Sequence, residues 1–168
     1  MKMTKGTSIS EFFKSEKPIF SLEFFPPKND AGGERILKTA GILKPYNPDF
    51  VSITYGAGGS TRETTMQYAR ILKNDFGFEV MPHLTCVGHT QDELLKILED
   101  FSEEGFCNIM ALRGDPPQGE TQFQPVKGGL SFATELVALI RKYFPHFGIG
   151  VGGYPEKHPE SPSKKEDL

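Results

Sequence analysis

The stretch PIFSLEFFPPK, residues 18–28, combines the pattern of a buried β-strand with a single acidic residue. Its apolar side chains crowd a short span that Pro26 and Pro27 close, as is typical of a strand that ends in a turn. Glu23 lies near that end, where burial of a charge is costly unless the charge is paired. Glu23 is therefore either a paired or functional carboxylate, or a residue that faces water from an edge strand.

Beyond this stretch, apolar strands alternate with helices of 3.6-residue periodicity. A short opening helix is predicted over residues 8–14, with Phe12 and Phe13 as its apolar anchor. The predicted strands are 18–25, 49–55, 79–86, 107–113 and 148–154, and the helices that follow the first four are about 31–44, 61–75, 90–104 and 129–143. Ser60 and Glu63 form a capping-box pattern at the start of the second of these helices. Such alternation requires parallel strands joined by right-handed crossovers.

Two α/β architectures fit this alternation: an open doubly wound sheet, and a (β/α)8 TIM barrel of which the chain covers the first five βα units, since a whole barrel needs about 250 residues. Polar side chains share one strand face near the carboxyl ends: Ser21 and Glu23, Ser52 and Thr54, His83 and Thr85, Arg113 and Asp115. A doubly wound sheet is covered by helices on both faces and has little reason for this pattern, whereas a barrel has its active site at that end. We therefore predict one partial catalytic barrel domain over residues 1–168, truncated before strands six to eight. In this domain Glu23 belongs to the group of polar residues at the carboxyl ends of the strands.

The composition limits the classes to which the protein can belong. Of the 168 residues, 37% are hydrophobic and 24% are charged, which is typical of a soluble globular domain. A formal charge of −3 without a stripe of Lys and Arg argues against a nucleic-acid partner. Cys86 and Cys107 lie in apolar surroundings outside any CxxC pair, which indicates reduced thiols in a cytoplasmic protein, with a disulfide as the alternative. No signal region and no apolar run of membrane-spanning length is present, so no membrane partner is expected.

Glu23 is the strongest candidate for proton transfer. Beside Phe24, Phe25 and two prolines, its carboxyl group is expected to be desolvated. Desolvation favours the protonated form, which suits a general acid near neutral pH. The alternative is that Glu23 serves as a partner for a His or Arg of a neighbouring strand.

Two motifs follow the second and third strands. The Gly-rich loop TYGAGGST, residues 54–61, either lets the backbone approach a ligand, often a phosphate at a helix N-terminus, or is a simple tight turn. PHLTC, residues 82–86, places His83 and Thr85 on the polar face, and His83 is either a core histidine or part of a site. No second His or carboxylate stands at metal-ligand spacing, which argues against a zinc site.

Two further motifs end the fourth and fifth strands. ALRGDPP, residues 111–117, carries Arg113 and Asp115 in a loop stiffened by two prolines, which favours ligand binding over a purely structural pair of the two charges. GGYPEKHPES follows the fifth strand and brings Tyr154 and His158 into one loop. These side chains either flank a planar ring or bond its substituents, or the segment is a proline-rich turn.

Five segments together resemble the catalytic domain of the methylenetetrahydrofolate reductase family: FSLEFFPPK, DFVSITYGAGGST, MPHLTCVGHT, NIMALRGDPP and GGYPEKHPE. They occur in that family's order and spacing, from about residue 8 to the last residue. The resemblance implies a (β/α)8 barrel that holds FAD and reduces 5,10-methylenetetrahydrofolate to 5-methyltetrahydrofolate with NADH or NADPH. It also implies a role in one-carbon metabolism and methionine synthesis, a folate substrate and a homo-oligomeric parent protein.

The resemblance implies roles for individual residues as well. Glu23 matches the general acid that assists opening of the folate's five-membered ring, and Asp115 matches a catalytic and substrate-binding position close to the pterin. Thr54 matches a residue near the nicotinamide nucleotide. Contacts with the flavin are implied for Tyr55, Ala57, His83, Arg113, Gly114, Asp115, Ala133, Tyr154, His158 and Asp167.

The sequence departs from the family pattern in its length. Strands six to eight are absent, together with the family's folate-binding glutamine, its substrate-stacking aromatic residue and a lysine beside the flavin phosphates. Reductase activity is therefore expected of the parent protein, and residues 1–168 alone are expected to be inactive. Two other function classes stay open: a different flavin or pterin barrel enzyme, and a non-catalytic module left by truncation.

Overall fold

The computed structural model describes residues 6–55, 62–116, 119–120 and 122–167. Within them the strands are β1 (Ser21–Phe24), β2 (Phe50–Ile53), β3 (Val80–Thr85), β4 (Asn108–Leu112) and β5 (Gly148–Val151). The helices are α1 (Ile9–Phe12), α2 (Asp30–Leu43), α3 (Arg62–Asn74), α4 (Gln91–Glu103), α5 (Ala133–Tyr143) and α6 (Lys164–Asp167), with a 3₁₀ turn, η1 (Lys44–Tyr46), after α2. The predicted alternation of strands and helices is confirmed. No helix in these ranges is long and apolar enough to cross a membrane.

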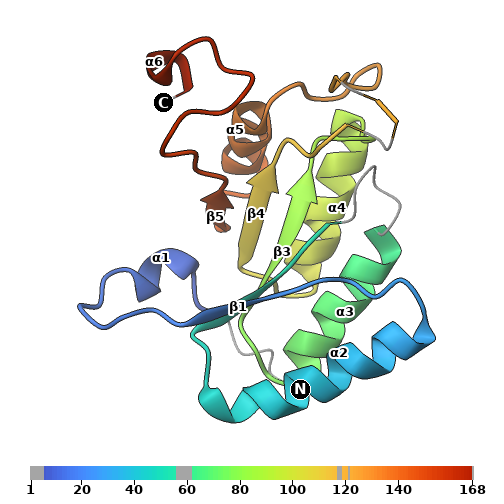
Figure 1. The fold of residues 1–168 in the computed structure, drawn as a ribbon, viewed down its shortest axis with the longest axis vertical. Coiled ribbons are helices and arrows are strands. Elements are labelled where there is room, and N and C mark those ends of the chain that lie inside the picture. Colours follow the sequence, from blue (N-terminus) through green and yellow to red (C-terminus); the bar gives the residue numbers. More distant parts are fainter. Residues whose placement is uncertain (1–5, 56–61, 117–118, 121, 168) are drawn as a thin grey trace.

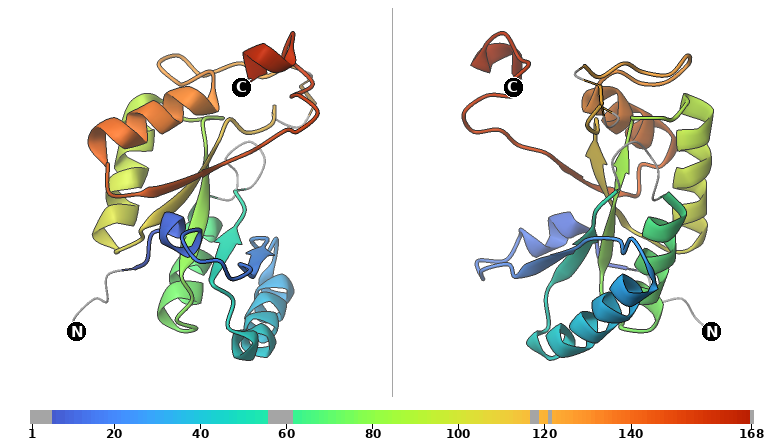
Figure 2. Two further views of the ribbon diagram at one scale, coloured as in Figure 1. Left: turned by 90° about the vertical axis from the view of Figure 1, so that its left-hand side faces the viewer. Right: turned by 45° about the vertical axis from the view of Figure 1, so that its right-hand side comes forward.

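The strands form one parallel sheet whose order, β1-β2-β3-β4-β5, is the order of the chain. Figure 2 shows α3, α4 and α5 on one side of this sheet and α1 on the other. In a doubly wound sheet the strand order reverses and helices cover both faces. The doubly wound alternative is therefore wrong for the described residues, and the fold is α/β with a five-stranded parallel sheet.

The core lies between the sheet and helices α2 to α5 (Figure 1). Buried side chains of α4 and α5 recur three or four residues apart, which gives each helix one apolar stripe toward the sheet: Leu94, Leu98, Phe101, Leu136 and Ile140. Alternate residues of the strands meet these stripes: Val51, Ile53, Val80, Leu84, Ile109 and Ala111. Because successive strand residues point to opposite faces, the other half of each strand faces away from the helices.

The sheet face opposite the four long helices is partly covered by α1. Ile9 is buried there with Phe50 and Met81. The ring of Phe12 stacks on Phe50 with centroids 6.2 Å apart. Phe13 is 68% exposed, so the predicted apolar anchor is correct for Phe12 and wrong for Phe13, which lies just beyond the single helical turn.

The start of α4 is fixed by a capping box. The Thr90 hydroxyl accepts a hydrogen bond from the Glu93 N–H at 3.3 Å, and the Glu93 carboxylate accepts one from the Thr90 N–H at 2.8 Å. These two bonds satisfy N–H groups that a helix leaves without partners. The capping box predicted from Ser60 and Glu63 lies in part outside the described residues.

Helix α5 is shorter than the helix predicted over residues 129–143, because it begins at Ala133. The Glu135 carboxylate accepts hydrogen bonds from the N–H groups of Ser131 and Phe132 at 2.6 and 3.1 Å. Those N–H groups precede the helix and are held by a side chain within its first turn. The apolar periodicity of the sequence continues through residues 129–132, so the predicted start of the helix was too early.

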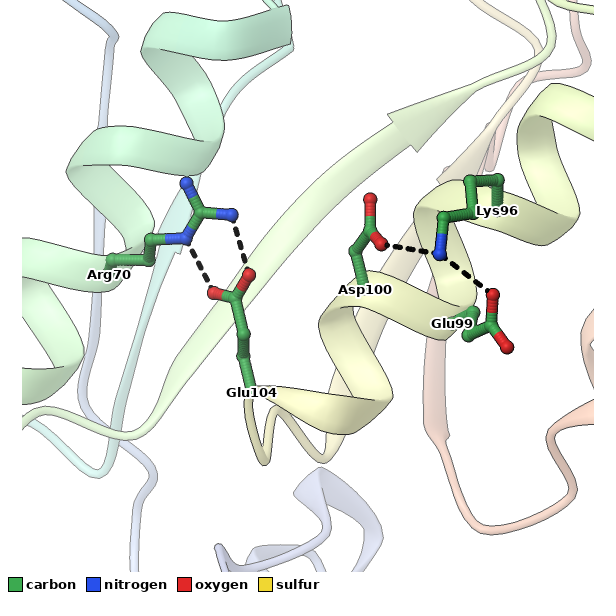
Figure 3. Close-up of polar contacts among 5 residues, drawn as sticks. All are labelled: Arg70, Lys96, Glu99, Asp100 and Glu104. Carbon is green, nitrogen blue, oxygen red and sulfur yellow. Dashed lines mark hydrogen bonds and ion pairs between the residues drawn. The ribbon is translucent and has the colours of Figure 1, made fainter.

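Ion pairs lie on the outer side of α3 and α4, as Figure 3 shows. Arg70 of α3 donates two hydrogen bonds to the Glu104 carboxylate just after α4, at 2.6 and 2.5 Å, and this contact raises the pKa of Arg70. Within α4, Lys96 lies 2.9 Å from Glu99 and 3.2 Å from Asp100. Because these side chains are partly exposed to water, the pairs add little to stability compared with the apolar core.

Asn108, the first residue of β4, connects residues 7–9 to the amino ends of the strands through hydrogen bonds. Its side chain is fully buried. Its Oδ1 accepts a hydrogen bond from the Ile9 N–H at 2.6 Å, and its Nδ2 donates to the Thr7 carbonyl and to Glu79 at 2.8 and 2.9 Å. The Thr7 N–H donates to the other Glu79 oxygen at 2.8 Å. Burial raises the pKa of Glu79, and these hydrogen bonds oppose that rise.

Cys86 and Cys107 are free thiols, as predicted, and the disulfide alternative is wrong. Cys86 is buried just after β3, where its thiol approaches the carbonyl oxygens of Leu112 and Phe132. Burial raises the pKa of this thiol to about 12. Since the thiolate is the reactive form, Cys86 is unreactive near neutral pH.

Candidate active site

The sheet face opposite α2 to α5 carries an open hollow of about 620 Å³. Strand residues of β1 to β4 line it, among them these six: Ser21, Glu23, Phe50, Ser52, Met81 and Met110. The apolar members among them continue the cluster formed with α1, whereas Glu23 carries the one ionisable group of the six. The hollow thus offers an apolar surface with one carboxyl group beside it.

Glu23 receives contacts from the two strands that follow it in the sheet. The register of β1 and β2 places Glu23 beside Ser52, whose hydroxyl donates a hydrogen bond to Glu23 Oε2 at 3.2 Å. His83 of β3 brings its Nε2 to 3.5 Å from the same oxygen. The structure therefore brings together three polar residues from three adjacent strands on one face of the sheet.

The expected desolvation of Glu23 is wrong. Its side chain is 48% exposed. Phe24 points to the other face of the sheet and is buried in the core, and Phe25 is itself 69% exposed. Neighbours in the sequence do not shield Glu23 because alternate strand residues face opposite ways. The Glu23 carboxyl group lies between the hollow on one side and Ser52 and His83 on the other.

Two buried polar atoms near the carboxyl end of β3 have no hydrogen-bond partner in the described part of the chain. They are His83 Nε2 and Thr85 Oγ1, in residues that are only 8% and 5% exposed. Burial lowers the pKa of His83, and the charge of Glu23 opposes this effect. Buried polar groups are nearly always paired in folded proteins. These two atoms therefore mark a place where a bound group would complete the hydrogen bonding.

Thr54 and Tyr55 follow β2 at the same end of the sheet. The Thr54 carbonyl accepts a hydrogen bond from the Thr65 hydroxyl of α3 at 3.1 Å. The Tyr55 hydroxyl lies 2.9 Å from His89 Nε2, and the two rings meet edge to face with centroids 5.8 Å apart. These contacts fix the first residues of the Gly-rich loop. Ala57 and the remainder of that loop lie outside the described residues.

Arg113, which follows β4, is paired with Glu160 and not with Asp115. Its Nη1 and Nη2 donate to the two Glu160 oxygens at 2.5 and 2.9 Å, which raises the pKa of Arg113. The guanidinium also lies 5.0 Å from the centre of the Phe123 ring, a favourable cation–π distance. Asp115 is exposed and makes no hydrogen bond with a described residue. The alternative of a structural pair between Arg113 and Asp115 is therefore wrong, and Arg113 holds the segment after β5.

Gly114 occupies a position that only glycine fits. Its φ is +88°, a conformation that residues with a side chain rarely adopt. A Cβ there would lie 2.7 Å from Val87 Cγ1 and 3.0 Å from Thr85 Cβ. The turn after β4 thus packs its backbone directly onto the end of β3, beside the Thr85 hydroxyl, which has no hydrogen-bond partner among the described residues.

The other predicted contact residues lie in and around the C-terminal segment. Ala133 is the half-buried first residue of α5. The rings of Tyr154 and His158 meet edge to face with centroids 4.7 Å apart, and Tyr154 is 54% exposed. The side chain of Asp167 lies outside the described residues. Tyr154 and His158 therefore contact each other directly in this structure.

Two partners of the site residues were not predicted from the sequence. Ser52 shares the polar face with Glu23, and the pairing of β1 with β2 would have been the signal for their contact. Glu160 lies in the proline-rich segment after β5, 47 residues away from its partner Arg113. No periodicity or motif connects two positions so far apart in the chain.

Glu160→Gln is expected to loosen the segment after β5, because Arg113 loses its charged partner. Amide hydrogen exchange over residues 154–161 should become about tenfold faster, as for a segment that opens locally. The measurement is hydrogen exchange read by mass spectrometry, with Glu156→Gln as the control, since Glu156 is exposed in the same segment. Equal exchange in the two variants would contradict the holding role of Arg113 and Glu160.

A parallel sheet in chain order defines the class of the protein as α/β, and in its described residues polar side chains from three adjacent strands gather near the carboxyl ends of the strands. The family model described as methylenetetrahydrofolate reductase matches residues 8–168. The chain therefore belongs to the methylenetetrahydrofolate reductase family.

Curated relatives carry the same family name. The chain is 45% identical over 142 residues to methylenetetrahydrofolate reductase (NADH) 1 of Arabidopsis thaliana, a match that covers 84% of the chain and 24% of that protein. It is 38% identical over 148 residues to 5,10-methylenetetrahydrofolate reductase of Escherichia coli, covering 88% of the chain and 48% of that protein. For methylenetetrahydrofolate reductase 2 of Saccharomyces cerevisiae the identity is 37% over 157 residues, with 92% and 26% covered. The chain thus spans about a quarter to about half of the length of these relatives.

Proposed function

We propose that the whole protein reduces 5,10-methylenetetrahydrofolate to 5-methyltetrahydrofolate, with NADH or NADPH as the reductant and FAD as the cofactor. Membership in the methylenetetrahydrofolate reductase family supports this reaction. The observation that carries the proposal is the convergence of Glu23, Ser52 and His83, from three adjacent strands, beside an open hollow. The proposal concerns the whole protein because the chain spans only part of its relatives.

We also propose that residues 1–168 are the first five βα units of a (β/α)8 barrel, within one catalytic domain. The parallel sheet in chain order supports this architecture, as do helices α3 to α5 on one side of it. In the described residues β1 and β5 each pair on one side only, so both keep an edge that further strands could extend. A barrel would place the face that carries Glu23 on its inside.

The residues at the carboxyl ends of the strands fit a flavin. The fit rests on two buried atoms that make no hydrogen bond with a described residue, His83 Nε2 and Thr85 Oγ1, and on the backbone approach that Gly114 permits. The residues proposed to hold the cofactor, with Thr54 toward the nicotinamide, are Thr54, Tyr55, Ala57, His83, Arg113, Gly114, Asp115, Ala133, Tyr154, His158 and Asp167. When bound, FAD supplies the hydride chemistry between the nicotinamide and the folate.

Glu23 is proposed to act as the general acid toward the folate. A carboxyl group at the edge of the hollow can deliver a proton to a nitrogen of the folate's five-membered ring, which assists opening of that ring. The apolar residues Phe50, Met81 and Met110 line the same hollow and give it an apolar surface beside the carboxyl group. Asp115 is proposed to face the pterin from the turn after β4, where its carboxylate is exposed and free of hydrogen bonds to described residues.

The test is purification of the whole protein, identification of its released chromophore and assay of folate reduction. The proposal predicts a yellow protein that releases FAD and converts 5,10-methylenetetrahydrofolate to 5-methyltetrahydrofolate when NADH or NADPH is supplied. A colourless protein that binds the folate without reducing it would show a flavin-free function instead. Release of FMN in place of FAD would overturn the cofactor assignment.

A further inference from the structure

We infer that Ser52 is a positioning residue for Glu23, which holds one carboxyl oxygen so that the other one faces the hollow and carries the proton to be transferred. This inference rests on the proposed function, in which Glu23 is the general acid. It goes beyond that function by assigning separate tasks to the two oxygens of the carboxyl group. Three features of the structure carry it: the place of Ser52 in the sheet, the contacts of Oε2, and the surroundings of Ser52.

Ser52 is held by the sheet and not by a loop. It lies within β2, and the strand pairing places it between Glu23 of β1 and Met81 of β3. Only 5% of its surface is exposed. Because strands on both sides fix the backbone of β2, the Ser52 hydroxyl stays at one place relative to Glu23. A donor fixed in this way can orient a side chain that is itself 48% exposed.

Both polar contacts of the Glu23 carboxyl group reach the same oxygen. The Ser52 hydroxyl donates to Oε2 at 3.2 Å, and His83 Nε2 lies 3.5 Å from that oxygen. Oε1 makes no hydrogen bond with a described residue, while Glu23 lines the hollow. A protonated carboxyl group has one accepting oxygen and one O–H, and an oxygen that already accepts from a hydroxyl is the accepting one. The proton is therefore placed on Oε1.

In the proton transfer from Glu23 to the folate, each bond that breaks is matched by a bond that forms. The O–H bond at Glu23 Oε1 breaks, and an N–H bond forms on the ring nitrogen of the folate that leaves the bridging carbon. That nitrogen keeps the electron pair of the broken C–N bond, while the lone pair of the second nitrogen forms the C=N bond of the opened product. Glu23 is left as a carboxylate, and the Ser52 hydroxyl continues to donate to its Oε2.

A purely structural role explains Ser52 less well. Its hydroxyl donates to Glu23 and makes no other hydrogen bond among the described residues. Ser52 also lines the hollow, so removal of its hydroxyl leaves neighbouring core side chains in place. Ser52→Ala should therefore keep the fold while Glu23 loses its fixed orientation. A misplaced catalytic group slows its own step and spares steps that do not need it.

The kinetic test compares variants of the whole protein in the two half-reactions, measured separately by anaerobic stopped flow. Ser52→Ala is expected to slow oxidation of the reduced enzyme by 5,10-methylenetetrahydrofolate about tenfold or more, a part of the full contribution of a positioned acid. Reduction by NADH or NADPH should be unchanged. Ser52→Thr, which keeps the hydroxyl, should largely restore the folate step. Ser102→Ala, which removes a hydroxyl of α4 that contacts His146, is the matched control.

A second measurement needs neither flavin nor turnover. In the flavin-free protein, NMR titration of the His83 ring reports the nearby Glu23 charge, which raises the pKa of His83 against the lowering effect of burial. Glu23→Gln should lower the pKa of His83 further. Ser52→Ala should shift it in the same direction, because the carboxylate is no longer held at His83 Nε2, and Ser52→Thr should reverse the shift.

The outcomes separate the inference from the function on which it rests. A normal folate step in Ser52→Ala, with a slow one in Glu23→Gln, would overturn the positioning role alone. Equal slowing of both half-reactions in Ser52→Ala, or an unchanged His83 titration, would also overturn it. A normal folate step in Glu23→Gln would overturn the acid role and the proposed function of Glu23. If Ser52→Ala does not fold, Ser52→Cys, which nearly keeps the volume but is a weak donor, takes its place in both measurements.

Discussion

Glu23→Gln is expected to slow the reduction of 5,10-methylenetetrahydrofolate by about 10²-fold or more, which is the contribution of a positioned general acid. Gln keeps the size of the side chain and can still accept the Ser52 hydrogen bond, but it has no carboxyl proton to give. Reduction of the enzyme by NADH or NADPH should proceed at its normal rate, because that step moves a hydride and does not use this proton. Stopped-flow measurement of each half-reaction separates the two effects.

The control for this variant is Glu34→Gln. Glu34 is an exposed residue of α2, so the same chemical change is made away from the hollow. It should leave both half-reactions as they are in the unaltered protein. Equal slowing of both half-reactions in Glu23→Gln would show that Glu23 holds the strands together and is not an acid.

Asn108→Ala is expected to destabilise the protein by about 3–5 kcal/mol, the range for loss of a buried hydrogen-bond network. The change removes three hydrogen bonds from a fully buried side chain. It leaves the Ile9 N–H and the Thr7 carbonyl without that partner and takes one donor from the half-buried Glu79 carboxylate. The measurement is urea unfolding, followed by circular dichroism, with the free energy of unfolding extrapolated to water.

Asn74→Ala is the matched control, because Asn74 is exposed at the end of α3. Its free energy of unfolding should change by less than about 0.5 kcal/mol, as for most surface substitutions. A loss in Asn108→Ala as small as that of the control would contradict the role assigned to the Asn108 contacts at the amino ends of the strands.

The sequence was sufficient for the order and type of the main elements, because their apolar periodicities differ clearly. It was also sufficient to place Glu23, Ser52 and His83 on one face, since strand residues alternate strictly between two faces. It did not predict how much water reaches Glu23. That quantity depends on what covers the face, and the neighbouring Phe24 turns away into the core.

Contacts between distant segments could not be predicted. Asn108 begins a strand that is otherwise apolar, and its partners Thr7 and Glu79 lie 101 and 29 residues away. Arg113 has Asp115 two residues away, yet the carboxylate that reaches its guanidinium belongs to Glu160. Local charge patterns favour the near partner, whereas the observed pair depends on the path of the chain after β5.

The most direct test of the central claim is a single turnover of the whole protein. The protein is first reduced with NADH or NADPH without oxygen and is then mixed with 5,10-methylenetetrahydrofolate, while the absorbance is followed and the folate is analysed by chromatography. We predict that one equivalent of 5-methyltetrahydrofolate forms as the yellow colour of the oxidised flavin returns. A flavin that stays reduced while the folate is recovered unchanged would contradict the proposed function.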